Sequence, residues 1–250
     1  MSCRKSFFIG FLVLALTASL LPAQGKGECF VIKGDNTRIK GQKLTSDDQG
    51  NLTLDVDGKI QQNFKRGQYK YGCIPKPQAV AELEKLFEAK KYAEVTAKAP
   101  AEFAKYKYLG WSYTIAALEA ESWLAQGNVE KANKAYMEGA RIAGENRDRL
   151  EETSMRIFIA RKEYDKVENL LKKKMLNADN QQAARAFNLR GDIALAKGDK
   201  KQAVLEYLKT LMLFEGKKVA NERAEAKEKA TKLLRELKDP RVDKISGYEM

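Results

Sequence analysis

The chain has 250 residues, no histidine and a formal net charge of +12 at pH 7. Without histidine, no imidazole can activate a serine or cysteine nucleophile and no histidine-containing zinc site can form, so we expect a non-enzymatic protein without metal or cofactor. Basic and acidic residues are interspersed along the chain rather than gathered in one basic block, so the charge does not predict nucleic-acid binding.

Residues 1–25 have the pattern of a cleaved signal peptide. Arg4 and Lys5 precede an apolar run over residues 7–16, and small residues follow it. The run is shorter than the roughly 20 apolar residues that cross a bilayer, so we expect cleavage and no stable membrane anchor. This pattern predicts a periplasmic or secreted protein, exported by a bacterial cell.

Residues 27–77 show the two-residue period of β-strands. Leu52 and Leu54 alternate with polar residues, and the alternation resumes after Asp57-Gly58. Asp-Gly between two such runs predicts a hairpin with a tight type I′ turn. Further strands are expected at residues 29–32, 38–40 and 69–74, so the segment predicts a small antiparallel β module. Its spacing and turns resemble the small SH3-like or Sm-like barrels that precede helical repeats in some exported bacterial proteins.

Cys29 and Cys73 flank this β module. An even pair of cysteines in an exported protein predicts a disulfide, which would staple residues 27–77. A pair of redox-active thiols is the alternative, although these cysteines lack the Cys-x-x-Cys spacing.

Four helical hairpins are predicted over residues 78–216. Their turns contain Lys90, Gly127, Lys162 and Gly198, which follow one another at steps of 37, 35 and 36 residues. A constant period close to about 34 predicts stacked helical pairs, the architecture of an α-solenoid. Pro100 is expected to cut short the second helix of the first pair.

The second and fourth hairpins resemble the tetratricopeptide repeat. Small and aromatic residues stand at the same offsets from Gly127 and Gly198, namely Ala116, Ala120, Trp123, Ala132 and Tyr136 in one hairpin and Phe187, Gly191, Ala194, Ala203 and Tyr207 in the other. The third hairpin departs from the pattern, with Met155 at a small position and Lys162-Glu163 in the turn, and the first is weaker still. The resemblance implies a mainly α-helical, tetratricopeptide-like solenoid after the β module.

Residues 217–238 predict a C-terminal capping helix. Ala226, Ala230 and Leu233 lie on its apolar side, and Glu225 and Lys229 form a favourably ordered pair on the side expected to be exposed. Residues 239–250 are expected to form a flexible tail.

The first helix of each pair lines the inner face of such an array. In the register of the family, the residues facing inward are Glu84, Phe87, Thr114, Ala117, Glu121, Leu124, Arg149, Glu152, Arg156, Ile159, Arg185, Asn188, Asp192 and Leu195. The predicted partner-binding residues are Arg149, Glu152, Arg156, Arg185, Asn188 and Asp192. The arginines could hold a carboxylate or an acidic peptide. Alternatively, Glu152 and Asp192 neutralise them within the groove.

We therefore predict an exported, non-enzymatic scaffold that binds another envelope or secreted protein through its concave helical face. The alternative is a structural component that self-associates, through the capping helix or the β module, into a homo-oligomeric envelope assembly. An enzyme would need carboxylate chemistry without histidine, for instance a glycan-cleaving pair among Glu84, Glu121 and Glu152.

Overall fold

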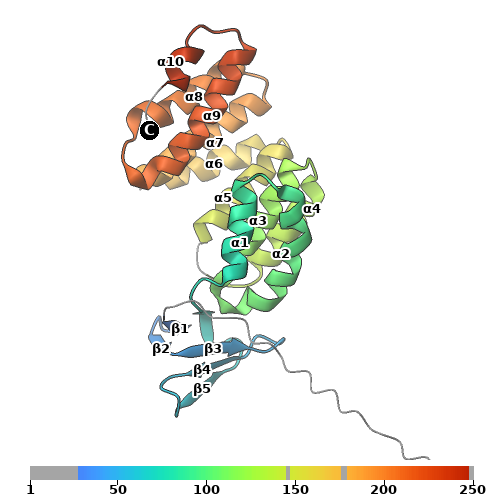
Figure 1. Ribbon diagram of the computed structural model, residues 1–250, viewed down its shortest axis with the longest axis vertical. Coiled ribbons are helices and arrows are strands. Elements are labelled where there is room, and N and C mark those ends of the chain that lie inside the picture. The colour runs from blue at the N-terminus through green and yellow to red at the C-terminus, as the bar shows by residue number, and fades with distance from the viewer. Residues whose placement is uncertain (1–27, 145–146, 176–178, 248–250) are drawn as a thin grey trace, which may run out of the picture.

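The computed structural model describes residues 28–144, 147–175 and 179–247. β-strands form one end of an elongated molecule, and the helices extend from them toward the C-terminus at the other end (Figure 1). The predicted signal peptide, residues 1–25, lies outside the described residues, as do residues 248–250 of the predicted tail. Within the described ranges, no helix is long and apolar enough to cross a membrane.

The structure confirms a small antiparallel β module ahead of the helices. Its strands form two three-stranded sheets, in the orders β2-β1-β6 and β3-β4-β5. The alternation of Leu52 and Leu54 is confirmed, because both side chains are buried between the sheets while Thr53 is not. The strands are β1 (Cys29–Lys33), β2 (Arg38–Gly41), β3 (Lys43–Ser46), β4 (Leu52–Asp55), β5 (Gln61–Phe64) and β6 (Tyr69–Cys73).

The predicted β4–β5 hairpin is confirmed, but its turn is longer than the expected two residues. The N–H of Val56 donates to the carbonyl of Ile60 at 2.9 Å, which leaves residues 57–59 as the connection. Oδ1 of Asp57 accepts hydrogen bonds from the N–H groups of Lys59 and Ile60. The Asp57 side chain thus stabilises a turn that the Asp-Gly pattern alone does not specify.

The expected disulfide is not formed in the structure, where Cys29 and Cys73 are buried thiols. Phe30, rather than Cys29, stands opposite Cys73 in the ladder between β1 and β6. Because successive residues of a strand point to opposite faces, Cys29 enters the core between the sheets while Cys73 shares a face with Phe30. A disulfide requires side chains that point toward each other, so this register opposes the bridge. Burial also raises the pKa of the Cys29 thiol, which disfavours the redox-active alternative.

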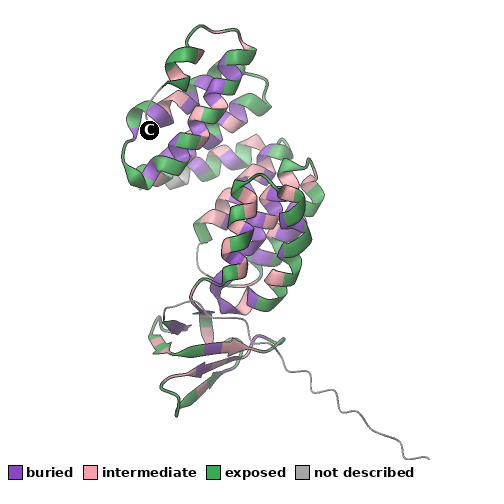
Figure 2. Cartoon of the chain, viewed as in Figure 1, coloured by how far each residue is buried: buried purple, intermediate pink, exposed green. Residues whose placement is uncertain are grey.

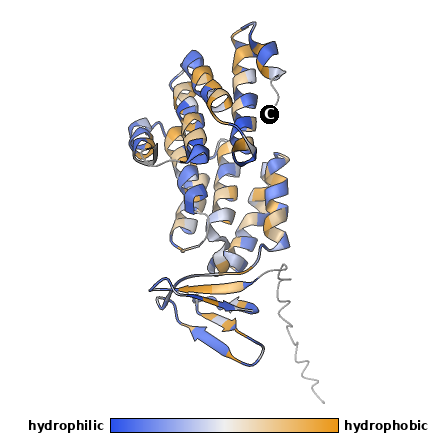
Figure 3. Cartoon of the chain, turned by 90° about the vertical axis from the view of Figure 1, so that its left-hand side faces the viewer, coloured by the Kyte–Doolittle hydropathy of each residue, from blue (hydrophilic) through white to orange (hydrophobic). Residues whose placement is uncertain are grey.

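Ten α-helices follow in the described chain, most of them in antiparallel pairs. Their buried residues lie where neighbouring helices face each other (Figure 2), and the helices carry both hydrophobic and hydrophilic residues along their length (Figure 3). The helices are α1 (Gln78–Glu88), α2 (Tyr92–Tyr106), α3 (Ser112–Ala125), α4 (Val129–Ala140), α5 (Arg147–Ala160), α6 (Tyr164–Met175), α7 (Asn180–Ala196), α8 (Lys200–Leu213), α9 (Ala220–Glu236) and α10 (Val242–Ser246), with a kinked connection at Lys107–Trp111 and a 3₁₀ turn at Lys217–Val219.

The same turn ends five of these helices, α1, α3, α5, α7 and α9. A residue with positive φ follows each helix: Lys90, Gly127, Lys162, Gly198 and Lys238. The N–H groups of this residue and of the next residue both donate to carbonyls of the last helical turn. For example, the Asp199 N–H donates to the carbonyl of Ala194, and the Asp239 N–H donates to the carbonyl of Leu234. This double hydrogen bond is the Schellman motif, which satisfies helix-terminal carbonyls and sets the direction of the following chain. The described residues therefore contain five such turns, one more than the sequence predicted.

Two boundaries differ from the predictions. Helix α2 continues through Pro100 to Tyr106, because packing of Val95 and Ala99 against neighbouring helices outweighs the one backbone hydrogen bond that proline removes. Residues 242–246 of the predicted tail form α10, since Val242 and Ile245 pack against the apolar cluster of α8 and α9.

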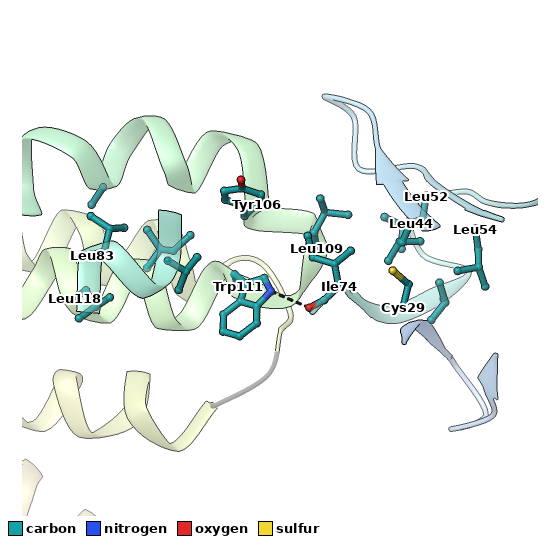
Figure 4. Packing of buried hydrophobic residues seen from close by; sticks show 14 of the residues in the cluster. Cys29, Leu44, Leu52, Leu54, Ile74, Leu83, Tyr106, Leu109, Trp111 and Leu118 are labelled. Atoms are coloured by element: carbon teal, nitrogen blue, oxygen red, sulfur yellow. Dashed lines mark hydrogen bonds between the residues drawn. The ribbon is translucent and has the colours of Figure 1, made fainter. Parts of the chain in front are cut away.

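The β module and the first three helices share one hydrophobic core (Figure 4). Trp111 donates its indole N–H to the carbonyl of Ile74 at 3.1 Å, and the Ile74 N–H donates to the carbonyl of Leu109 at 3.2 Å. Gly110 has φ of 91°, and a Cβ there would lie 2.7 Å from Sγ of Cys73. Only glycine permits both this backbone conformation and this close approach. The kinked connection at Lys107–Trp111 therefore joins the module to the helices as a single packed unit.

Candidate binding groove

A groove of about 470 Å³ runs along the ends of α1, α3, α5 and α7. Each of these helices contributes one large apolar residue to its lining, namely Phe87, Leu124, Ile159 and Leu195. Each stands three residues before the positive-φ residue of its turn, so the groove is built by the repeated turn itself. These four residues belong to the predicted inward-facing set, as do Glu121, Arg156 and Asp192 of the same lining. The predicted inward-facing set does not contain the other lining residues, which are Tyr92, Ala125, Ala160 and Ala196.

Arg156 of α5 lies at the polar edge of this groove. It forms ion pairs with Glu152 at 3.0 Å, Asp192 of α7 at 3.4 Å and Glu225 of α9 at 3.0 Å. Burial acts to lower the pKa of Arg156, but the carboxylates outweigh burial and raise this pKa above its ordinary value. Arg156 is thus a permanent charge whose donors are already committed to three carboxylates.

Lys229 of α9 extends the same network. Its ammonium lies 2.5 Å from Asp192 and 2.7 Å from Glu225. Tyr207 of α8, which is fully buried, donates its hydroxyl to Asp192 at 2.6 Å. The pair Glu225–Lys229 was expected on the exposed side of the capping helix; it is instead partly buried and faces α7.

Arg185 and Asn188 of α7 are held by the start of α9. Arg185 pairs with Glu222 at 2.7 Å and lies 3.7 Å from Glu152. The amide of Asn188 donates to the backbone carbonyl of Glu222 at 2.9 Å, and Thr210 donates its hydroxyl to the Asn188 side chain at 2.7 Å. Arg149 lies 4.0 Å from Glu121 and over the ring of Phe87.

The structure therefore brings the six predicted residues together on one face, but engages them with one another and with α9. Among the described side chains, the network contains four cations, Arg149, Arg156, Arg185 and Lys229, and five carboxylates, Glu121, Glu152, Asp192, Glu222 and Glu225, a net charge of −1. This arrangement corresponds to the second of the two sequence alternatives, in which the arginines are neutralised within the groove. An anionic ligand would have to displace these carboxylates.

The contribution of α9 was missed by the sequence analysis. A signal was available in Glu222, Glu225 and Lys229, which recur at helical spacing and so share one face of α9. The three carboxylates considered for glycan cleavage are engaged by other side chains: Glu84 pairs with Lys76 at 2.8 Å, Glu121 accepts a hydrogen bond from the hydroxyl of Thr153 at 2.7 Å, and Glu152 pairs with Arg156.

No family model matches the chain, and neither a curated protein nor a solved structure is significantly similar to it. The functional interpretation therefore rests on the geometry of the groove.

Proposed function

We propose that this protein is an exported, non-enzymatic scaffold of tetratricopeptide-like helical pairs that binds a segment of another envelope or secreted protein in its inner groove. The five Schellman turns support a repeated architecture, because they follow one another at steps of 35 to 40 residues. The step of 40 separates Gly198 from Lys238, the turn that the sequence analysis did not predict. The pattern of residues 1–25 supports export.

The observation that carries the proposal is the row formed by Phe87, Leu124, Ile159 and Leu195. Four helices contribute the same turn position to one open groove of about 470 Å³, within the roughly 300–1,000 Å³ typical of ligand sites. Leu195 is 38% exposed, so its side chain is accessible to a bound segment. A continuous apolar row of this kind suits the side chains of a bound polypeptide segment.

The charges beside the row indicate the character of that segment. The four cations of the network are paired, and its net charge is −1. We therefore propose that the segment is apolar with neutral or basic flanks, rather than the acidic peptide that the arginines suggested.

A photo-cross-linking experiment with a matched control tests the proposal. A photoreactive amino acid replaces Leu195 in the groove or Leu170 on α6, which is 37% exposed and does not line the groove. In the native extracytoplasmic fraction, we expect one discrete cross-linked protein from position 195 and none from position 170. Leu195→Asp should then reduce binding of the identified partner, whereas Leu170→Asp should not. Equal cross-linking from both positions would refute the groove as the binding face.

Self-association is the second candidate function. On α8, Met212 and Leu213 are 69% and 64% exposed, and exposed apolar side chains of this size favour protein contacts. Light scattering on the chain without residues 1–25 distinguishes the two: a monomer at all concentrations removes the self-associating assembly and leaves the groove proposal untouched.

A further inference from the structure

A second cavity of about 340 Å³ lies between α6, α7 and α8 and shares no lining residue with the groove. Leu171, Ile193 and Ala194 form its apolar part. Glu168 and Lys197 join α6 to α7 at 2.9 Å on its rim. Its volume lies within the range of about 300–1,000 Å³ found for small-ligand sites.

Glu206 of α8 lines this cavity and is 2% exposed. Glu206 stands eight residues after Gly198, the positive-φ residue of the fourth helical pair. The same position in the first three pairs is held by Lys98, Ala135 and Leu170, of which only Ala135 is buried. A buried carboxylate at this position is costly unless its charge and hydrogen bonds are satisfied. Packing of the helical pair alone therefore does not account for Glu206.

The two oxygens of Glu206 differ in their contacts. Oε1 accepts hydrogen bonds from Gln202 and Lys209, both at 2.8 Å. Oε2 is buried without a hydrogen bond, and Nε of Arg190 forms an ion pair with it at 3.8 Å. Since 3.8 Å exceeds hydrogen-bonding distance, Oε2 still lacks the donor that a buried carboxylate oxygen requires.

We propose that this cavity binds an aliphatic ammonium group, such as the end of an alkylamine or a lysine side chain, with the ammonium donating to Oε2 of Glu206. The methylene stem lies along Leu171 and Ile193, and the ammonium takes the place of the Arg190 side chain, which is 46% exposed and able to move into solvent. The site is independent of the groove and of the partner proposed for it.

The preference for a cation follows from where the charges lie. Glu206 is almost fully buried, whereas Arg190, Lys197 and Lys209 keep 41% to 46% of their side chains exposed. Charges interact more strongly away from water, because solvent screens the exposed ones. A ligand cation at Glu206 therefore gains more electrostatic binding free energy than a ligand anion would gain at the rim.

The test uses the ¹⁵N-labelled full chain titrated separately with n-pentylammonium, pentanoate and pentan-1-ol at constant ionic strength. We expect saturable amide shifts around Ile193 and Gln202 with n-pentylammonium, and binding at least about tenfold weaker for the other two probes, which cannot make the charged hydrogen bond. Tighter binding of pentanoate would show an anion site, and equal binding of all three probes would show a merely apolar cavity; either result overturns the proposal.

Three variants sharpen the test. Glu206→Gln should weaken n-pentylammonium binding by about tenfold or more, because it removes the buried charge. Glu94→Gln, which removes an exposed pair with Lys91 and does not line the cavity, should change it by less than about twofold. Arg190→Ala should strengthen it, because the competing guanidinium is gone; weaker binding in this variant would refute the assignment. If Glu206→Gln fails to fold, n-pentylammonium binding by the Arg190→Ala variant still tests the proposal, because Arg190 is exposed.

Discussion

At the scale of single residues, Glu225 shows how partner charges reverse the effect of burial. Burial alone would raise the pKa of this carboxyl, but Arg156 at 3.0 Å and Lys229 at 2.7 Å outweigh burial and lower the pKa to about 2. A carboxyl whose pKa is depressed in the folded state stabilises that state above its unfolded pKa, and the stabilisation is lost as the pH falls toward the folded value. Glu225 therefore links stability to pH between its ordinary pKa of 4.5 and about 2.

This linkage predicts the behaviour of Glu225→Gln. At neutral pH the variant should unfold at a lower urea concentration than the parent protein, because Arg156 and Lys229 lose a shared partner. The difference in unfolding free energy should stay constant down to about pH 4.5 and then shrink toward pH 2. Glu94→Gln, which removes an exposed pair with Lys91, serves as control and should shift stability by less than about 0.5 kcal/mol. A difference independent of pH would contradict this role of Glu225.

At the scale of elements, the five Schellman turns set the length of each helical pair. Two of them use glycine at the positive-φ position, Gly127 and Gly198, and three use lysine, at Lys90, Lys162 and Lys238. The left-handed conformation costs a residue with a Cβ about 1 kcal/mol, so the lysine turns hold strain that the glycine turns do not. The pairs persist because helix packing outweighs this strain.

Exchanging residues between the two kinds of turn tests this account. Lys162→Gly should raise the unfolding free energy by about 0.5–1 kcal/mol, since it relieves the left-handed backbone. Gly198→Ala should lower it by about 1 kcal/mol through conformation alone, because a Cβ at Gly198 meets no atom within 4 Å. Urea denaturation measures both changes. Shifts of the same sign would show that the backbone conformation of the turns does not control their stability.

At the scale of the whole molecule, the β module is not an independent domain. Leu52 and Leu54 of β4 belong to the same buried cluster as Ile115 and Leu118 of α3. The kinked connection at Lys107–Trp111 links the two through the hydrogen bond from Trp111 to Ile74. Elements that share a core open together.

Native-state hydrogen exchange should therefore assign β4 and α3 to one unfolding unit. The amides of Leu54 and Leu118 should exchange with the same free energy and the same denaturant dependence, while those of α10, which contains no fully buried residue, should exchange at lower free energy. Trp111→Phe removes the hydrogen bond to Ile74 and should lower the protection of both segments equally. Loss of protection confined to β4 would show that the module folds separately.

The sequence by itself determined the order of β module and helices, the position of the first four hairpin turns and the row of groove-lining residues formed by Phe87, Leu124, Ile159 and Leu195. These features follow from local periodicity and turn chemistry, which adjacent residues encode. The tertiary structure alone decided that Arg156 and Arg185 also pair with carboxylates of α9, that Cys29 and Cys73 point to opposite faces, and that α2 passes through Pro100. Each of these outcomes depends on strand register or on contacts between residues distant in the chain, because the energy of a buried charge or a lost hydrogen bond is set by what packs against it.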